Sequence, residues 1–253
     1  MMDGYRYFLY LSYSGSAYHG WQVQPGKITV QEKIEEALKV ILQENTRITG
    51  AGRTDTGVHA RLFIAHFDSI RDDLAGNRNI VFRLNKYLPD DISVIDILAV
   101  KKDAHARFDA ISRTYMYYIS PLKDPFLKDF IYQRYGDLDV EAMNKASSLL
   151  LKHDDFTSFS KAHTQVKTNQ CNIFEAGWKV DGDMLIFTIK ANRFLRNMVR
   201  AIVGSMIDIG TGKFPPGHIE NIIKAKDRSS AGASAPASGL FLEDIEYDKG
   251  IFL

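Results

Sequence analysis

The sequence lacks the features that stabilise small secreted or metal-bound domains. It has one cysteine, Cys171, in 253 residues, which excludes a disulfide framework, and no cysteine or histidine pair has zinc-site spacing. It has no run of about eighteen apolar residues, so we expect no membrane-spanning helix. The N-terminus lacks the basic start and apolar block of a signal peptide. We therefore expect a cytoplasmic protein without a metal site.

The sequence also lacks an excess of charge of either sign. Lys and Arg number 32 and Asp and Glu 31, for a formal net charge of +1. A broad nucleic-acid-binding surface usually needs a more basic chain, so any such site must come from local clusters of cations. Apolar residues make up 45% and charged residues 25%, which is typical of a globular protein with one large or two small domains.

The first half of the chain predicts six elements in the order β-α-β-β-α-β, the split ferredoxin-like pattern. Thr29 followed by Glu32 indicates a capping box at the first helix, and Pro89 should end the second. Strands are expected at 5–15, 47–49, 62–68 and 92–102, and helices at 29–42 and 79–88.

The second half predicts a similar plan. We expect strands at 113–120, 173–180, 184–191 and 240–247, and helices at 139–151, 194–209 and 218–225. Residues 229–239 are low in complexity and predict an extended connector. The predicted fold class is α+β, with an N-terminal domain over 1–104 and a C-terminal domain over 105–253. Two such halves would place a cleft between their sheets, and such clefts favour binding.

The expected helix at 194–209 has one strongly cationic side. At about 100° per residue its apolar residues share one face, and the opposite side carries Arg193, Arg196, Asn197 and Arg200. These arginines have no carboxylate three or four residues away. The pattern indicates an anion-binding face, and a solvated polar face is the alternative.

Cations and aromatic rings alternate over residues 105–118. The segment contains His105, Arg107, Phe108, Arg113, Tyr115, Tyr117 and Tyr118. Cations for phosphates and rings for stacking are what single-stranded RNA recognition requires. An amphipathic strand with its tyrosines in the core remains the alternative. By strand alternation, Tyr115 and Tyr117 share a face.

The stretch "GAGRTDTGVHA" at 50–60 resembles three motifs and fits none of them. It lacks the Gly-Lys-Ser/Thr ending of a P-loop, and its third glycine comes too late for the dinucleotide fingerprint. "DTG" is typical of aspartic proteases, but these need a second aspartate to share the proton, and no second "DTG" or "DSG" occurs. Arg53 favours an ionised Asp55. What remains is a carboxylate on a glycine-flanked loop, or a plain turn capped by Asp55.

Together, the motifs resemble those of the TruA-type tRNA pseudouridine synthases. "GAGRTDTGVHA", "HARFDA" followed by "RTYMYYI", "ANRFLRNMVR" and "GLFL" occur in that family's order. "YSGSAYHGWQVQP" and "TVQEKIEEAL" are also similar, so the resemblance covers residues 5 to 247. Thr56 stands where the family usually has Ala, and Ser14 where Asp is common.

The resemblance implies isomerisation of uridine to pseudouridine in the anticodon arm of tRNA. It also implies two ferredoxin-like halves whose sheets flank a central catalytic cleft, and a homodimer in which one tRNA contacts both subunits. The reaction exchanges the C1′–N1 bond for a C1′–C5 bond without a redox change, so we expect no cofactor and no metal.

The family match assigns three catalytic roles. Asp55 supplies the carboxylate, and Arg200, at the end of "FLRNMVR", is the cation that keeps it charged. An unpaired buried charge would cost several kcal/mol. Tyr115 stacks on the uracil, and it or its surroundings accept the proton that leaves C5. Direct attack of Asp55 on C1′ and a glycal route remain open.

The remaining assignments concern substrate binding. The target base must be flipped out of the arm, and Arg53 can replace it or clamp a phosphate. Leu240 or Leu242 is expected to form an apolar wall behind the uracil. Arg107, Arg193, Arg196 and Asn197 are expected to contact the RNA. A non-catalytic RNA-binding module and, on "DTG" alone, a dimeric aspartic protease are the alternative functions.

Overall fold

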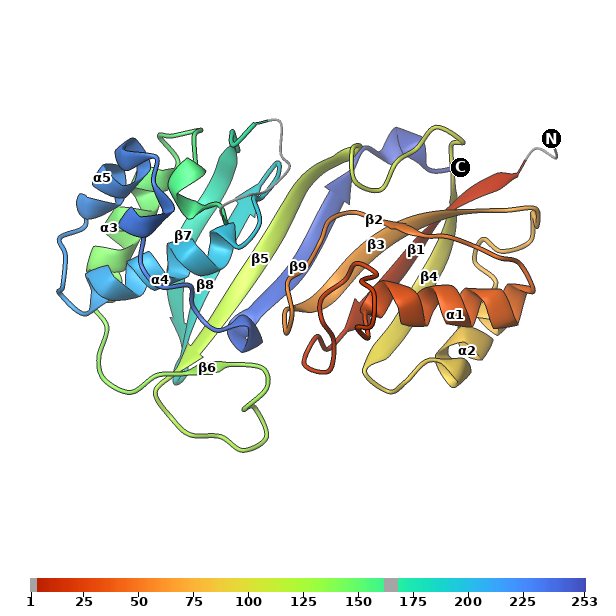
Figure 1. Cartoon of the computed structure of the whole chain (residues 1–253), viewed down its shortest axis with the longest axis horizontal. Coiled ribbons are helices and arrows are strands. Elements are labelled where there is room, and N and C mark those ends of the chain that lie inside the picture. Colours follow the sequence, from red (N-terminus) through yellow and green to blue (C-terminus); the bar gives the residue numbers. More distant parts are fainter. Residues whose placement is uncertain (1–3, 162–167) are drawn as a thin grey trace. The chain divides into compact units, whose positions relative to one another are not determined.

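The computed structural model describes residues 4–161 and 168–253 and confirms an α+β fold. The chain forms two compact units (Figure 1). Met1–Ile111 and Leu242–Leu253 make up the first, and Ser112–Phe241 the second. In the described parts of the chain, no helix has the length and apolarity to cross a bilayer.

The elements of the first unit follow the predicted order β-α-β-β-α-β. They are β1 (Tyr5–Tyr13), α1 (Val30–Leu42), β2 (Thr49–Gly50), β3 (His59–Ser69), α2 (Arg78–Tyr87) and β4 (Ile92–Val100). The central strand β1 pairs antiparallel with β3 on one side and β4 on the other, and β2 pairs with the outer side of β3. Figure 1 shows α1 and α2 side by side. The ferredoxin-like assignment itself stays a prediction.

Local signals account for the two helices of this unit. Thr29 accepts a hydrogen bond from the Glu32 amide and so caps α1, as the capping box predicts. Ile34 and Leu38 lie one turn apart and are fully buried. Each such side chain contributes roughly 1.5–3 kcal/mol on burial. Asn77 caps α2 in the same way.

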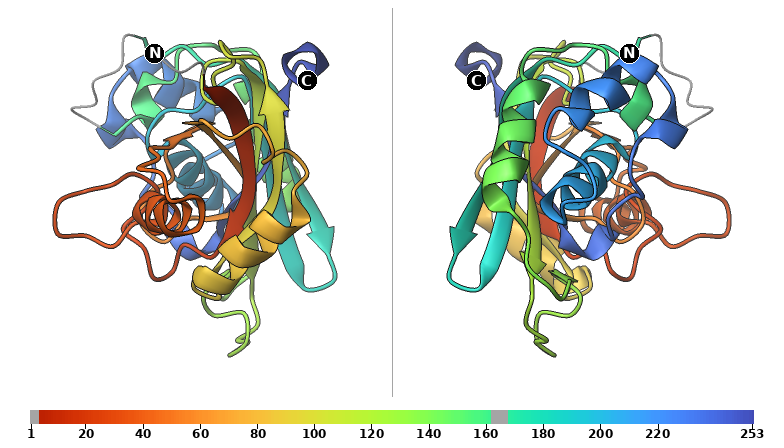
Figure 2. Two further views of the ribbon diagram at one scale, coloured as in Figure 1. Left: turned by 90° about the vertical axis from the view of Figure 1, so that its right-hand side faces the viewer. Right: turned by 90° about the vertical axis from the view of Figure 1, so that its left-hand side faces the viewer.

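The second unit contains an antiparallel sheet in the order β5-β8-β7. Its elements are β5 (Ala110–Ser120, which begins in the first unit), β6 (Tyr132–Gln133), α3 (Val140–Leu150), β7 (Ile173–Asp181), β8 (Met184–Ala191), α4 (Met198–Gly210) and α5 (His218–Ala225). Short 3-10 turns lie at Thr157–Phe159, Arg228–Ser230 and Ala237–Gly239. Helix α3 packs on β7 and α4, and Figure 2 (right) shows it running alongside the β7–β8 hairpin.

The last strand, β9 (Leu240–Tyr247), divides between the two units. Leu240 and Phe241 belong to the second unit, where the Phe241 ring meets Tyr118 edge to face at 5.3 Å. From Leu242 onward the strand belongs to the first unit, next to β3. A 3-10 turn at Lys249–Ile251 follows. The predicted strand at 240–247 is confirmed.

Helix α4 corrects the expected helix at 194–209. It begins at Met198, because Asn197 adopts a left-handed backbone conformation with φ of 67° that a right-handed helix cannot contain. Arg193 and Arg196 therefore precede the helix, and the predicted wedge of arginines on one helix face is wrong. The predicted apolar face is confirmed from Met198 onward, since Ile202 and Met206 are fully buried.

Candidate functional site

Asp55 lies in a tight turn between β2 and β3. The Val58 amide donates to the Asp55 carbonyl at 3.1 Å, and Gly57, the third residue of the turn, has φ of 78°. A type II turn requires a positive φ at this position, which favours glycine. Thr54 is buried, Asp55 is half-buried and Arg53 is exposed. The turn therefore places the half-buried Asp55 directly after the buried Thr54.

Two glycines of the "YSGSAYHGW" segment pack directly against the backbone of this turn. A Cβ on Gly15 would lie 2.1 Å from the Val58 carbonyl oxygen, and a Cβ on Gly20 would lie 2.5 Å from that of Thr54. Only glycine allows backbone segments to approach so closely. The Trp21 amide also donates to the Thr54 carbonyl at 3.2 Å. The backbone on both sides of Asp55 is thus fixed by direct contact.

The same segment connects the turn to α1 and to the core. Val30 and Gln31 at the start of α1 donate to the carbonyls of Gly20 and Trp21. The Trp21 ring stacks on Phe63 of β3, with centroids 4.0 Å apart. The Tyr13 hydroxyl shares a hydrogen bond of 2.9 Å with that of Thr54. From the sequence, residues 13–15 were expected to end a strand and the rest of the segment entered only through its resemblance, although its two glycines are a signal of close backbone approach.

Arg200, in the first turn of α4, is held by the connector at residues 229–239. Its Nε donates to the Ala235 carbonyl at 2.7 Å, and the Ala235 amide donates back to the Arg200 carbonyl at 3.0 Å. The connector was expected to be extended, and it has no helix or strand between the 3-10 turns at Arg228–Ser230 and Ala237–Gly239. It crosses α4 at Gly204, where the two backbones are in direct contact. A Cβ on Gly204 would lie 1.7 Å from the Ala233 carbonyl oxygen.

The two tyrosines expected on one face of β5 differ in their surroundings. Tyr117 is fully buried, its hydroxyl donates to the Pro236 carbonyl at 2.8 Å, and burial raises its pKa far above the usual range. Tyr115 is half-buried, and its ring meets that of Phe194 edge to face at 5.1 Å. Tyr117 is therefore structural, and Tyr115 is the candidate for substrate contact.

Arg107 lies in a turn that is anchored by a buried histidine. His66 of β3 accepts a hydrogen bond on Nδ1 from the Ala106 amide at 3.1 Å. Burial lowers the pKa of His66 to about 4, with contributions from His105 and Arg6. The exposed Arg107 guanidinium lies 5.6 Å from the Phe108 ring centroid. The turn thus presents a cation and an exposed ring together.

The remaining candidates vary in exposure. Arg196 is exposed and Arg193 is half-buried. The side-chain Nδ2 of Asn197 donates to the Ser234 hydroxyl at 2.7 Å. Leu240 and Leu242 are buried. The first unit carries Arg53, Asp55, Arg107 and Leu242, and the second carries Tyr115, Arg193, Arg196, Asn197, Arg200 and Leu240. Among the described residues no His, Cys, Asp and Glu cluster suited to a metal ion occurs.

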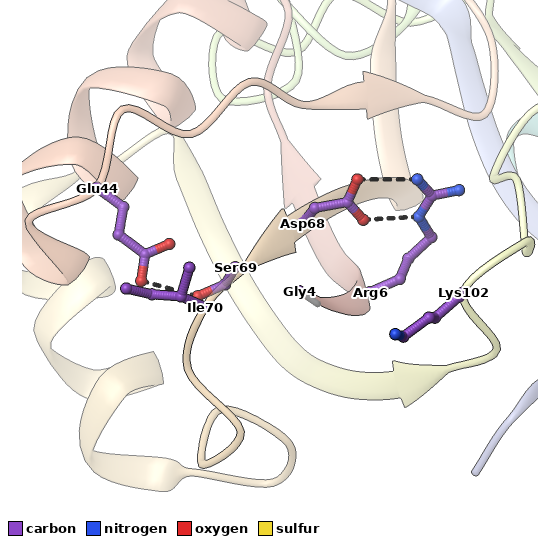
Figure 3. A pocket seen from close by; sticks show the side chains of 7 residues that line it. All are labelled: Gly4, Arg6, Glu44, Asp68, Ser69, Ile70 and Lys102. Atoms are coloured by element: carbon purple, nitrogen blue, oxygen red, sulfur yellow. Dashed lines mark hydrogen bonds and ion pairs between the residues drawn. The ribbon is translucent and has the colours of Figure 1, made fainter. Parts of the chain in front are cut away.

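A hollow of about 430 Å³ in the first unit involves none of these candidates (Figure 3). Its lining includes Arg6, Asp68, Ser69, Glu44 and Lys102. Arg6 and Asp68 form two parallel hydrogen bonds of 2.7 and 2.8 Å, and the Ser69 hydroxyl donates to Glu44 at 2.9 Å. Because Arg6 and Asp68 neutralise each other, the hollow is a weaker candidate than the Asp55 turn.

The comparisons with known proteins point to one family. Residues 146–248 match a family model described as tRNA pseudouridine synthase. A tRNA pseudouridine synthase A of Parabacteroides distasonis is 51% identical, over 98% of both chains. One of Bacteroides thetaiotaomicron is 50% identical, over 98% of this chain and 92% of its own. One of Bacillus subtilis is 39% identical, over 94% and 97%.

Proposed function

Because the chain belongs to the tRNA pseudouridine synthase A family, we propose that it isomerises uridine to pseudouridine in the anticodon arm of tRNA. The observation that carries the proposal is the braced turn around Asp55, with the glycines Gly15 and Gly20 beneath it. A catalytic carboxylate must be held in one position relative to the reacting atoms, and a loop fixed by backbone contacts meets that need.

The reaction conserves all its atoms and electrons. The C1′–N1 bond breaks, the uracil turns, C1′ joins C5, the proton on C5 leaves and N1 gains a proton. Asp55 acts on the ribose or the uracil ring as the ionised carboxylate. We propose that Arg200 keeps this carboxylate ionised and that Tyr115 stacks on the uracil and assists removal of the C5 proton.

Substrate binding is proposed for the other candidates. Arg53, exposed next to Asp55, takes the place of the flipped base or clamps a phosphate. Arg107, Arg193 and Arg196 contact the RNA backbone, for which guanidinium groups are well suited, and Asn197 belongs to the same RNA-binding surface. Leu242, with Leu240, provides an apolar wall behind the uracil. No metal and no cofactor enters these steps.

Quaternary structure and location are part of the same proposal. We propose a cytoplasmic homodimer of chains with domains over 1–104 and 105–253, in which one tRNA contacts both subunits. Light scattering of the purified protein should give the mass of two chains and, with tRNA added, of a dimer–tRNA complex. The mass of one chain in both samples would contradict the dimer.

Mapping pseudouridines in cellular tRNA tests the function. Cells without the protein should lack pseudouridine at specific anticodon-arm uridines, and the wild-type chain should restore it. Asp55→Asn should fail to restore it at equal protein level. An unchanged pseudouridine map in cells without the protein would contradict the proposal.

A further inference from the structure

The reciprocal pair between Arg200 and Ala235 restricts the direction of the Arg200 guanidinium. Two hydrogen bonds join the residues, one from the Arg200 side chain and one to its backbone. A guanidinium is planar, and its donors point in fixed directions. Fixing Nε against one carbonyl therefore restricts the directions in which the two terminal nitrogens can point. How narrow that restriction is depends on how firmly the Ala235 carbonyl is held.

Ser234, the residue before Ala235, is the centre of a hydrogen-bond network. Its Oγ accepts from the Asn197 side-chain amide at 2.7 Å and from the Arg228 guanidinium at 2.9 Å. Asn197, in its left-handed conformation, is also the residue directly before α4. One hydroxyl thus connects the start of the helix that carries Arg200 to the segment that holds the Arg200 side chain.

Arg228 and a glycine crossing fix the segment on its other side. Arg228 donates to the carbonyls of Ala231 and Gly232 at 3.3 and 3.1 Å, and the Gly232 amide donates to the Ser205 hydroxyl at 2.9 Å. A Cβ on Gly232 would lie 2.9 Å from the Gly204 backbone. The segment cannot shift along α4 without breaking these contacts.

From this geometry we infer that Ser234, supported by Arg228, is a positioning residue for Arg200 in the isomerisation. The inference rests on the proposed function and on the role proposed for Arg200. Ser234 acts through the Ala235 carbonyl and does not touch the substrate. Its loss should leave Arg200 present but misdirected, which lowers turnover more than it weakens tRNA binding.

Single-site kinetics with purified tRNA test the inference. Ser234→Ala, which removes the shared acceptor, should lower kcat about tenfold and leave KM for tRNA within about twofold. Ser234→Thr keeps the hydroxyl and should restore most of kcat. The matched control is Ser230→Ala, an exposed serine of the same segment, which should behave as wild type. Wild-type kcat in Ser234→Ala would overturn the inference.

One further readout separates positioning from general stability. In an Arg200→Lys background, which lacks the planar fork, Ser234→Ala should cause no additional loss of kcat. Fully additive losses, or a loss of kcat that tracks the melting temperature, would overturn the inference.

The outcomes remain distinct from a failure of the proposed function. A wild-type protein without activity on any tRNA contradicts the isomerase itself, whereas an active wild type with an equally active Ser234→Ala contradicts only the positioning role. If Ser234→Ala does not fold, Arg228→Lys provides the test. It keeps the charge but loses the fork that reaches Ser234 and the two carbonyls, and it should lower kcat several-fold with KM for tRNA little changed. Wild-type behaviour of Arg228→Lys would overturn the inference.

Discussion

Gly20 and Gly26 have similar left-handed backbone conformations in different surroundings. Their φ values are 87° and 69°, but a Cβ on Gly20 would lie 2.5 Å from the Thr54 carbonyl oxygen, whereas one on Gly26 would meet nothing within 4 Å. Gly20→Ala combines strain with a backbone clash, so it should destabilise by more than about 2 kcal/mol. It should also displace Asp55 and abolish turnover.

Gly26→Ala is the matched control for this prediction. It carries the backbone strain alone and should destabilise by about 1 kcal/mol with turnover intact. Urea unfolding and a turnover assay measure both effects. Equal losses in the two variants would mean that the contact beneath the Asp55 turn has no special importance.

His66 makes the stability of the fold depend on pH in the acidic range. Its pKa in the folded protein is about 4, below the value of about 6.5 for an unfolded chain. Between these two pH values the unfolded chain binds the proton more readily than the folded one. The contribution of His66 to the free energy of unfolding is therefore fully present above pH 6.5 and is lost as the pH falls toward 4. The contribution that is lost is about 3 kcal/mol.

His66→Asn isolates this contribution. The Asn amide oxygen can accept the Ala106 amide bond that His66 Nδ1 accepts but does not titrate. The variant should therefore lose less stability than the wild type between pH 7.5 and pH 5 in urea titrations. The same loss in both proteins would show that His66 does not cause it.

At the scale of elements, the crossing of α4 by the connector is the closest backbone approach described above. Gly204→Ala would place a Cβ 1.7 Å from the Ala233 carbonyl oxygen. Both contacting groups are backbone, so neither α4 nor the connector can relieve the clash by a side-chain movement. We expect a loss of more than about 2 kcal/mol in the free energy of unfolding. Gly177→Ala, whose nearest neighbour would be 3.7 Å away, should change it by about 0.5 kcal/mol or less. A tolerated Gly204→Ala would contradict the described crossing.

The element boundaries show which parts of the fold the sequence could predict. Helices α1 and α5 and strands β8 and β9 lie where periodicity and capping residues place them, because those signals are local. The start of α4 could not be predicted in this way. It depends on the left-handed Asn197 and on a bond from its side chain to Ser234, 37 residues further along the chain.

At the scale of the whole molecule, the sequence offers candidates for the proposed chemistry but not the contacts that support them. Motifs indicate Asp55, Tyr115 and Arg200, which stay predictions, because chemically special residues recur in fixed local patterns. The contacts that support Asp55 and Arg200 involve the backbone of glycines and alanines and the hydroxyl of one serine. Such residues have little chemical character of their own, so only the folded chain reveals which of them meet.

The most direct test of the central claim is the release of tritium from tRNA labelled at C5 of uracil. Formation of pseudouridine replaces the C5–H bond by a C5–C1′ bond, so the wild-type protein should release tritium to water in proportion to the pseudouridine formed. Asp55→Asn should keep the fold and bind tRNA as the wild type does, yet release none. No release by the wild type from any tRNA, or undiminished release by Asp55→Asn, would contradict the assignment of Asp55 as the catalytic carboxylate of a tRNA pseudouridine synthase.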